Sequence, residues 1–522
     1  MALSGVKPSQ IFGHTAVGMS PTTVNKCKSN IAEATGMMGA GACATSVIRW
    51  AFRKGKYTNA SADPRVCIPY DHIKAWMAMY SRMSNANKII VTKNWHRKHA
   101  RMKNAKSKWQ CVRGPMDATI ATLMEARWKP ESPTCWVTPD GDATNFMYEK
   151  GISHHRVLHA LRTGLEADLW KHAADADRGS GLGDGMPHFG PASSTYDTFV
   201  KKGKHAMARA LELIITNRSW CGARLLQANI ITEEEAKCKR CSMDILETPY
   251  HRYYQCPAND IIGEEEVTNS QDLHTHVTRD TKHECMWFKG ILPGQRVAEP
   301  VGWLDEAECE ATVLGKFSQI LNKTGKVGTD GGGDQEKDPR NRRVSSGAAV
   351  FDPDTNDVAM LFAKVPGNQT VPRAELYALL QTIVRMKDDI EYTVYVDASY
   401  VLNGLTSRTK HYSQGTNGDL WTRLYEASKT KQVIYRKVKS HVSNMDQWEI
   451  YNMTEEALIY NEMADKVCTL ASTANERSFA ARGDDGRQYK LASKAAARIA
   501  AIEAEIWKDT PERILSRRDR LH

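Results

Sequence analysis

Four acidic residues in the last third of the sequence have the types and placement expected of a metal-dependent active site. Asp330 and Asp397 follow strand-like runs, whereas Glu375 and Asp465 lie on predicted helices. Each acid taken singly also fits a turn, a helix cap or a solvated helix charge. Together they can converge at one edge of a sheet, where crowded carboxylates need cations to offset their repulsion. Oxygen ligands of this kind favour Mg²⁺ or Mn²⁺.

A second group of potential ligands is the pattern Cys238-x2-Cys241-x9-His251-x4-Cys256. Thiolate and imidazole ligands at this spacing can complete a tetrahedron around Zn²⁺ and leave no open position, which is typical of a structural site. The spacing therefore predicts a small zinc module. The alternative is an apolar corner that contains unmetallated thiols.

The third feature is the basic stretch 84–113, which contains nine Lys or Arg residues, two tryptophans and no acid. Cations for phosphates beside aromatic faces for bases would make a nucleic-acid surface. The alternative is a solvated basic helix face whose tryptophans belong to the core. The candidate nucleic-acid-binding residues are Lys93, Trp95, Arg97, Lys98, Arg101 and Lys103.

The elements that must position the acids alternate between strands and helices. Strands are predicted over 326–330, 344–351, 358–365, 392–396 and 433–438. A helix with Glu375 in its first turn opens at Arg373, a second helix starts near Ser399, and a third begins near Thr454 and carries Asp465. This order predicts an α/β domain.

The motifs around the acids resemble those of type 1 ribonuclease H. They are Thr-Asp-Gly at Asp330, Arg-Ala-Glu-Leu at Glu375, Val-Asp-Ala-Ser-Tyr-Val at Asp397 and Asn-Glu-x-Ala-Asp at Asp465. The resemblance covers residues 326–472 and implies the ribonuclease H-like fold, a five-stranded mixed sheet flanked by helices. It also implies that the four acids bind metal and that His441 helps product release or proton transfer. Ser440 before that histidine and the long segment after it depart from the family pattern.

The activity that this resemblance implies is endonucleolytic hydrolysis of the RNA strand of an RNA–DNA hybrid by two Mg²⁺ or Mn²⁺ ions. One ion would activate water and the other would stabilise the departing 3′ oxygen. Contacts to 2′-hydroxyls in the wide minor groove would select RNA. The alternative is a catalytically decayed nucleic-acid-binding protein of retroelement origin. An integrase or resolvase of the same superfamily fits the motifs poorly.

The segment 238–257 resembles the zinc-binding segment that follows the polymerase in non-LTR retrotransposon reverse transcriptases. Residues 11–15 and 113–117 also resemble sequence downstream of the palm in such polymerases. The chain has no Tyr/Phe-x-Asp-Asp motif of reverse-transcriptase type, so we expect no polymerase activity from it alone. A polymerase encoded upstream, fused or on a separate chain, is a possible partner.

Composition predicts a soluble intracellular protein without a membrane partner, and it does not distinguish nucleus from cytoplasm. The hydrophobic content of 41% and charged content of 25% are ordinary for globular proteins, and the net charge of +10 favours a polyanionic partner. Most of the twelve cysteines are scattered singly, which suits a reducing compartment. No run of apolar residues resembles a signal peptide or a membrane span.

The chain is predicted to contain six regions. They are a mostly helical, basic, thumb- or connection-like region 1–177, a Gly-rich linker 178–200, the zinc-binding module 201–260, a connection 261–325, the ribonuclease H domain 326–472 and a charged helical tail 473–522. Within the first region, the spacing of Ile73, Trp76, Met77 and Tyr80 predicts one buried face of a helix.

Overall fold

The computed structural model of the chain forms two compact units. The first contains Met1–Thr144, Leu158–Ala298 and Arg482–His522, and the second contains Asn145–Val157 and Glu299–Ala481. The residues that the structure describes are 12–53, 62–147, 152–177, 182–183, 185–294, 303–333, 336, 341–407, 417–439, 453–476 and 478–508.

The second unit is built on a six-stranded mixed sheet with the order β10-β9-β5-β6-β7-β4. Neighbours β5, β6 and β7 pair antiparallel, whereas β9 runs parallel to β5 and β10 parallel to β9. The strands are β4 (Thr312–Leu314), β5 (Lys326–Gly333), β6 (Val344–Asp352), β7 (Asp357–Lys364), β9 (Glu391–Val396) and β10 (Gln432–Lys437).

This sheet confirms the predicted mixed sheet flanked by helices and corrects two details. The expectation of five strands was wrong, because β4, from the predicted connection, pairs antiparallel with the free edge of β7 and adds a sixth strand. Strand β5 also continues past Asp330 to Gly333, since its glycines pair with β6 as far as Val344. The three glycines are therefore part of the strand and do not form a turn.

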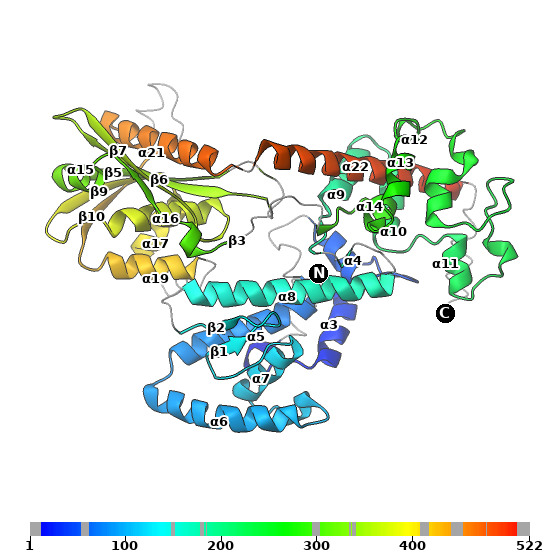
Figure 1. Cartoon of the computed structure of the whole chain (residues 1–522), viewed down its shortest axis with the longest axis horizontal. Helices are drawn as coiled ribbons and strands as arrows, with labels where there is room; N and C mark the ends of the chain where they lie inside the picture. Colours follow the sequence, from blue (N-terminus) through cyan, green and yellow to red (C-terminus); the bar gives the residue numbers. More distant parts are fainter. Residues whose placement is uncertain are drawn as a thin grey trace. The chain divides into compact units, whose positions relative to one another are not determined.

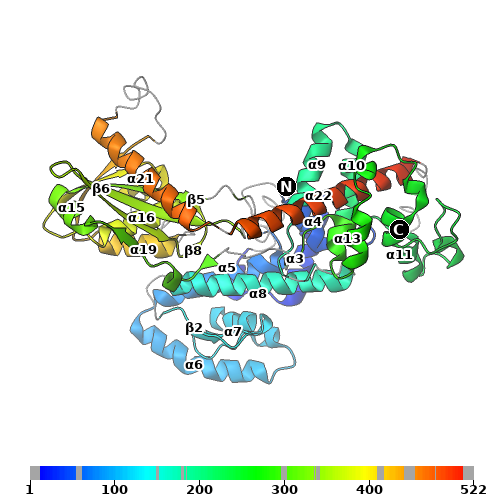
Figure 2. The ribbon, with the colours of Figure 1, turned by 45° about the horizontal axis from the view of Figure 1, so that its top comes forward.

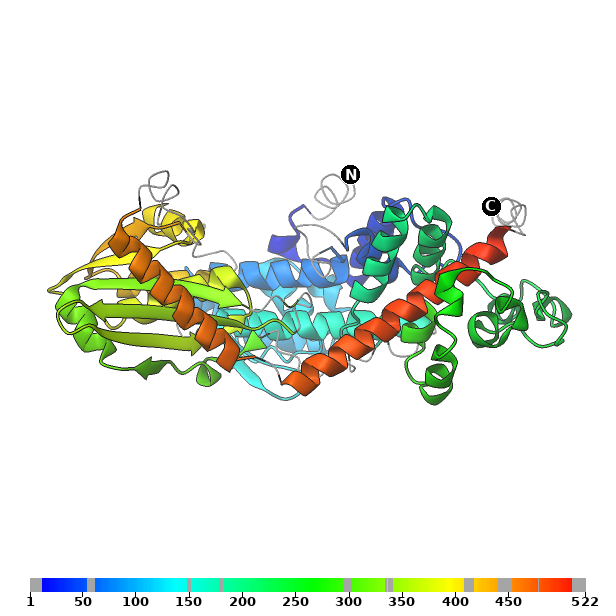
Figure 3. The same ribbon diagram turned by 90° about the horizontal axis from the view of Figure 1, so that it is seen from above.

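Helices cover both faces of the sheet. Helix α21 (Glu455–Ala474) lies on one face, and α16 (Val371–Ile383), α17 (Ser399–Ser407) and α19 (Gly418–Ala427) lie on the other (Figure 1). Figure 3 shows α21 running diagonally across the strands. Central strand β6 is buried along almost its whole length, as expected for a strand covered on both faces. Its run of Ser, Gly and Ala residues lets the helices approach closely.

The helix starts follow local capping signals. Thr454 caps α21, and its hydroxyl accepts a hydrogen bond from the Ala457 amide at 3.2 Å. Helix α16 begins at Val371 with a proline in its first turn. Glu375 therefore lies in the second turn of this helix, one turn later than the sequence predicted. A short ribbon of β3 (Trp303–Leu304) and β8 (Gly367–Asn368) completes the second unit, together with α15 (Phe317–Thr324).

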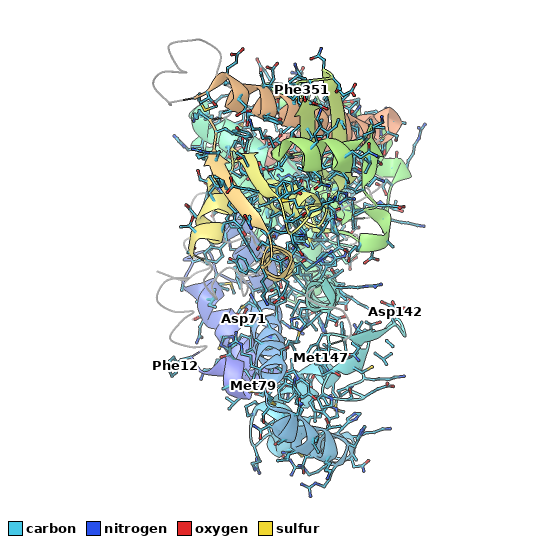
Figure 4. The ribbon with its side chains drawn as sticks, turned by 90° about the vertical axis from the view of Figure 1, so that its left-hand side faces the viewer. Phe12, Asp71, Met79, Asp142, Met147 and Phe351 are labelled. Carbon is cyan, nitrogen blue, oxygen red and sulfur yellow. The ribbon has the colours of Figure 1, made fainter. Side chains whose placement is uncertain are left out.

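The N-terminal part of the first unit is mainly helical. Helix α5 begins after Asp63, whose carboxylate accepts from the Arg65 amide at 2.9 Å. The predicted face of α5 is buried, and Met79 on the same helix is exposed (Figure 4). The elements are α2 (His14–Val17), α3 (Pro21–Glu33), α4 (Ala44–Ala51), α5 (Pro64–Ser81), α6 (Asn85–Lys103), α7 (Pro115–Glu125), β1 (Cys135–Val137), β2 (Ala143–Asn145) and α8 (Ile152–Asp177). The division between the units falls within α8, after Val157.

In the remaining part of the first unit, the predicted charged helical tail contains a long helix, α22 (Phe479–Lys508), with one buried face. Figure 2 shows α22 beside α9, α10 and α13. One face of α22, rich in alanine and isoleucine, is buried in the same core as these helices. A Cβ at Gly290 would lie 2.4 Å from the Ala496 Cβ, so only small residues allow this approach. The other helices are α9 (Gly190–Lys201), α10 (His205–Ile215), α11 (Gly222–Gln227), α12 (Glu265–Thr268), α13 (Leu273–Arg279) and α14 (Glu284–Lys289).

Part of the predicted Gly-rich linker 178–200 is helical. Helix α9 starts at Gly190, inside the predicted linker 178–200, because Pro191 and buried Ala192 and Thr195 give this stretch a helical core face. Within the part of the chain that the structure describes, no helix is both long and apolar enough to cross a bilayer.

Candidate metal centres

Three of the four predicted acids come together at one edge of the mixed sheet. One carboxylate oxygen each from Asp330, Glu375 and Asp397 lies within 4.8 Å of the other two. The parallel register explains part of this convergence, because Thr329 on β5 pairs with Val396 on β9. The next residues along the chain are Asp330, within β5, and Asp397, directly after β9, so the sheet places the two acids side by side.

Burial and mutual repulsion make this cluster unfavourable as three bare carboxylates. Burial, followed by the charges of Asp397 and Asp465, raises the pKa of Asp330 to about 6. The pKa of Glu375 is raised well above its usual range, first by burial and then by the charges of Asp330 and Asp397. The Glu375 Oε2 atom is buried and has no hydrogen-bond partner in the described part of the protein. Divalent cations with oxygen ligands would offset each of these costs, so the residues fit Mg²⁺ or Mn²⁺.

The two remaining predicted site residues are Asp465 and His441. Asp465 lies on α21, and its charge acts on the Asp330 carboxyl, but its oxygens are not in the group of three. His441 lies outside the residues that the structure describes. The geometry therefore brings together Asp330, Glu375 and Asp397, with Asp465 nearby.

Close backbone packing holds α21 against the strand that carries Asp330. A Cβ at Gly328 would lie 2.1 Å from the Tyr460 carbonyl oxygen. At Gly332 the amide donates to the Cys468 sulfur at 2.7 Å, and that thiol donates to the Ser345 carbonyl oxygen at 3.2 Å. These contacts fix the helix that carries Asp465 relative to β5.

A buried ion pair that the sequence did not predict positions the helix of Glu375. The Arg373 guanidinium donates to both carboxylate oxygens of Asp419 on α19, at 2.9 and 2.5 Å, and its Nε donates to the Pro366 carbonyl oxygen at 2.5 Å. Both charged side chains are almost fully buried. A two-point bond of this kind fixes orientation as well as distance. The sequence signals were the Arg two residues before Glu375 and the Asp in Asn417-Gly-Asp-Leu-Trp421.

The Cys/His pattern forms a compact cluster in the first unit. One ligand atom from each of Cys238, Cys241, His251 and Cys256 lies within 4.8 Å of the others. Tetrahedral bonds of about 2.3 Å to sulfur and about 2.0 Å to nitrogen would separate two sulfurs by about 3.8 Å and a sulfur and a nitrogen by about 3.5 Å. The Cys238 and Cys256 sulfurs are 3.8 Å apart, and Cys241 Sγ is 3.5 Å from His251 Nε2. The four residues therefore fit one tetrahedral Zn²⁺.

Local backbone features hold the four potential zinc ligands. A bridge between Lys237 and Leu246 closes the loop that carries Cys238 and Cys241, and His251 opens a short π-helical turn that ends before Cys256. Burial raises the pKa values of Cys238 and Cys256. Without a cation, burial thus disfavours the thiolate forms that zinc binds.

An ion-pair network connects this cluster to α22. Arg252, next to His251, donates to Glu247 at 2.9 Å and to Glu503 on α22 at 3.1 Å. The Tyr253 hydroxyl donates to Glu503 at 2.8 Å. Glu503 is only 1% exposed and lies 247 residues beyond Cys256 in the chain. The sequence contained no signal for this partnership, which joins residues that are remote along the chain.

The basic stretch lies mostly on α6, and the structure corrects one of its candidate residues. Trp95 is fully buried, and its indole nitrogen donates to the Pro130 carbonyl oxygen at 2.8 Å, so it cannot stack on a base here. Lys98 donates to buried Asp117 at 2.6 Å, which compensates its charge. The other candidates are exposed: Lys93, Arg97, Arg101 and Lys103.

Comparisons with known proteins agree with the geometry of the second unit. Residues 326–473 match the family model described as RNase H. This segment is an RNase H domain. Ribonuclease H of Caldicellulosiruptor saccharolyticus is 31% identical over 85 residues, which are 14% of this chain and 59% of that protein. Ribonuclease H of Thermoanaerobacter pseudethanolicus is 29% identical over 121 residues, which are 21% of this chain and 69% of that protein.

A solved structure described as a type 1 RNase H with the type 2 active-site motif is also similar to part of the chain. It is 15% identical with a TM-score of 0.23, and the match covers 29% of this chain and 74% of that one. The chain spans 59% of the length of the Caldicellulosiruptor enzyme. The segment 326–473 that matches the RNase H family model is less than a third of the chain.

Proposed function

We propose that the RNase H domain hydrolyses the RNA strand of RNA–DNA hybrids, and that Asp330, Glu375, Asp397 and Asp465 are its metal-binding acids. The carrying observation is the approach of Asp330, Glu375 and Asp397 to within 4.8 Å at one edge of the sheet. The raised pKa values of Asp330 and Glu375 support a cationic occupant, because a cation would stabilise both carboxylates.

In this proposal the protein's own groups provide position and charge. Asp330 and Asp397 directly follow the register pair Thr329 and Val396 of strands β5 and β9, which places the two acids beside each other. Glu375 adds a third carboxylate from a helix fixed by Arg373. When bound, two Mg²⁺ or Mn²⁺ ions supply an activated water and stabilise the leaving oxygen. By its place in the motif, His441 is proposed to assist proton transfer or product release.

Cleavage of a labelled RNA–DNA hybrid by the full chain, with duplex RNA and duplex DNA as controls, tests this proposal. We expect Asp397→Asn to lose cleavage while hybrid binding persists, since one negative charge leaves a crowded site. Ca²⁺ in place of Mg²⁺ should permit binding but not cutting. Equal cleavage by both proteins would contradict the assignment of the site. Inactivity of the wild type with both Mg²⁺ and Mn²⁺ would favour the decayed nucleic-acid-binding protein.

We also propose that Cys238, Cys241, His251 and Cys256 hold one structural Zn²⁺, as in the retroelement segment that this sequence resembles. Support comes from the two contact distances, which match a tetrahedral S₃N site. A retroelement origin of the chain is part of the same proposal.

The exposed side of α6 is proposed as a second nucleic-acid surface. No acidic residue lies on this helix, and Lys93, Arg97, Arg101 and Lys103 are exposed. Replacing Lys93 and Arg97 with Gln should reduce the slope of log K against log salt by about 0.9 for each phosphate that the variant no longer neutralises. An unchanged slope would instead identify a solvated helix face.

A further inference from the structure

Lys437 lies at the same edge of the sheet as the acid cluster. It is the last residue of β10, and its register partner on β9 is Val396, the residue before Asp397. The Lys437 Nζ donates a hydrogen bond to the backbone carbonyl oxygen of Asp397. The positive charge of Lys437 also acts on the buried Glu375 carboxyl. The cationic side chain of Lys437 therefore lies at the edge of the cluster of three carboxylates.

The surroundings of Lys437 give it no evident structural task. Its side chain is exposed, whereas the acids beside it are buried or half-buried. A backbone carbonyl occupies only one of the three ammonium donors, which leaves two for another partner. Water could satisfy the Asp397 carbonyl equally well at this exposed position.

A phosphate group is the chemical partner that suits this position. A lysine ammonium is a compact point charge on a flexible stem, so it can follow a phosphate oxygen without strict geometry. An ammonium group has donors and no acceptor, so Lys437 would bind the phosphate oxygens and not a metal ion. Any polynucleotide strand that binds at the acid cluster brings its phosphates close to the Lys437 side chain.

We propose that Lys437 binds a phosphate of the cleaved strand next to the acid cluster and so positions that strand. The proposal rests on the proposed hybrid nuclease function. It adds a substrate-binding residue on β10 to the four acids, at a position outside the motifs that suggested them.

The test uses the full chain as wild type, Lys437→Gln, Lys437→Arg and the matched control Arg436→Gln. Arg436 is an exposed cation on the same strand, and it faces the opposite side because adjacent strand residues alternate. Binding of a labelled hybrid is measured in Ca²⁺ over a range of salt concentrations, so the result does not depend on cleavage. Lys437→Gln should weaken binding about tenfold at low salt and lower the salt slope by about 0.9. Lys437→Arg should restore both, and Arg436→Gln should match the wild type.

Steady-state cleavage in Mg²⁺ gives a second readout. We expect Lys437→Gln to raise KM about tenfold with a smaller effect on kcat, since the residue positions the strand and does not act on the reacting atoms. An unchanged salt slope for Lys437→Gln, or an equal effect in Arg436→Gln, would overturn the phosphate contact even if the wild type cuts hybrids. A wild type that does not cut, combined with a reduced slope in Lys437→Gln, would refute the nuclease proposal and keep the phosphate contact.

Discussion

Gly331 on β5 and Glu375 on α16 are in backbone contact: a Cβ atom at Gly331 would stand 2.1 Å from the Glu375 amide nitrogen. No side chain fits at this distance, so glycine is needed for the helix to reach the strand. The contact lies one residue after Asp330. It explains how Glu375, on a helix, brings its carboxylate within 4.8 Å of those of Asp330 on β5 and Asp397 directly after β9.

The first prediction concerns this contact. Gly331→Ala should force α16 away from β5, abolish hybrid cleavage and lower the free energy of unfolding by about 1–3 kcal/mol, the usual cost of overpacking. Activity and urea unfolding are measured on the same preparation. Gly164→Ala is the control, because Gly164 is inside a helix with open space around it, and this change should be neutral or slightly stabilising. Full activity in Gly331→Ala would show that the contact does not position Glu375.

The second prediction concerns the buried Arg373–Asp419 pair. Asp419→Ala leaves the guanidinium buried without its partner, which should cost about 3–5 kcal/mol of unfolding free energy. Activity should fall as well, because the ion pair that orients α16 is then broken. Replacing both residues with apolar ones, Arg373→Met with Asp419→Leu, should recover much of the stability. A double variant no more stable than Asp419→Ala would contradict this explanation.

The third prediction concerns the Cys/His cluster. The protein should purify with about one Zn²⁺ per chain, and Cys241→Ser should lower both the metal content and the stability of the first unit. Cys111→Ser is the control, since Cys111 is equally half-buried but lies outside the cluster. Elemental analysis that finds no zinc in protein never exposed to a chelator would refute the site.

The fourth prediction is a pH dependence set by His72 in the first unit. Burial lowers the pKa of His72 to about 4, and its Nδ1 donates to the Thr15 carbonyl oxygen at 3.0 Å. A lowered folded-state pKa means that the neutral ring is stabilising. Its contribution is fully present above about pH 6.5 and is lost as the pH falls towards 4, by up to about 3 kcal/mol. Urea unfolding followed by tryptophan fluorescence should show this loss in the wild type.

The control for the pH effect is His72→Gln, which keeps hydrogen-bonding atoms but does not titrate in this range. Its unfolding midpoint should change less between pH 6.5 and 4 than that of the wild type. Equal pH slopes in the two proteins would assign the effect to other groups.

Several features could be predicted from the sequence because they depend on residues that are close along the chain. Strand periodicity and capping signals located β6, β7, β9 and β10, and Thr454 marked the start of α21. The order of acids after strands and on helices predicted that they would converge, and three of them do. The spacing of Cys238, Cys241, His251 and Cys256 likewise predicted one cluster. In each case a pattern of residues that are close along the chain identifies the site. For the acids, strand pairing then brings the strand ends that carry them together.

Tertiary structure decided what depends on burial and on contacts between remote residues. Trp95 interrupts a basic helix and resembles a base-stacking residue in sequence, yet it packs in the core. Helix α22 has a mostly polar sequence, yet alanines let it pack closely and bring Glu503 to Arg252. Gly331 and Lys437 lie at the acid cluster only because α16 packs against β5 and β9 pairs with β10. Composition and periodicity describe one helix or strand at a time. Tertiary packing determines which faces contact each other and which side chains are buried away from water.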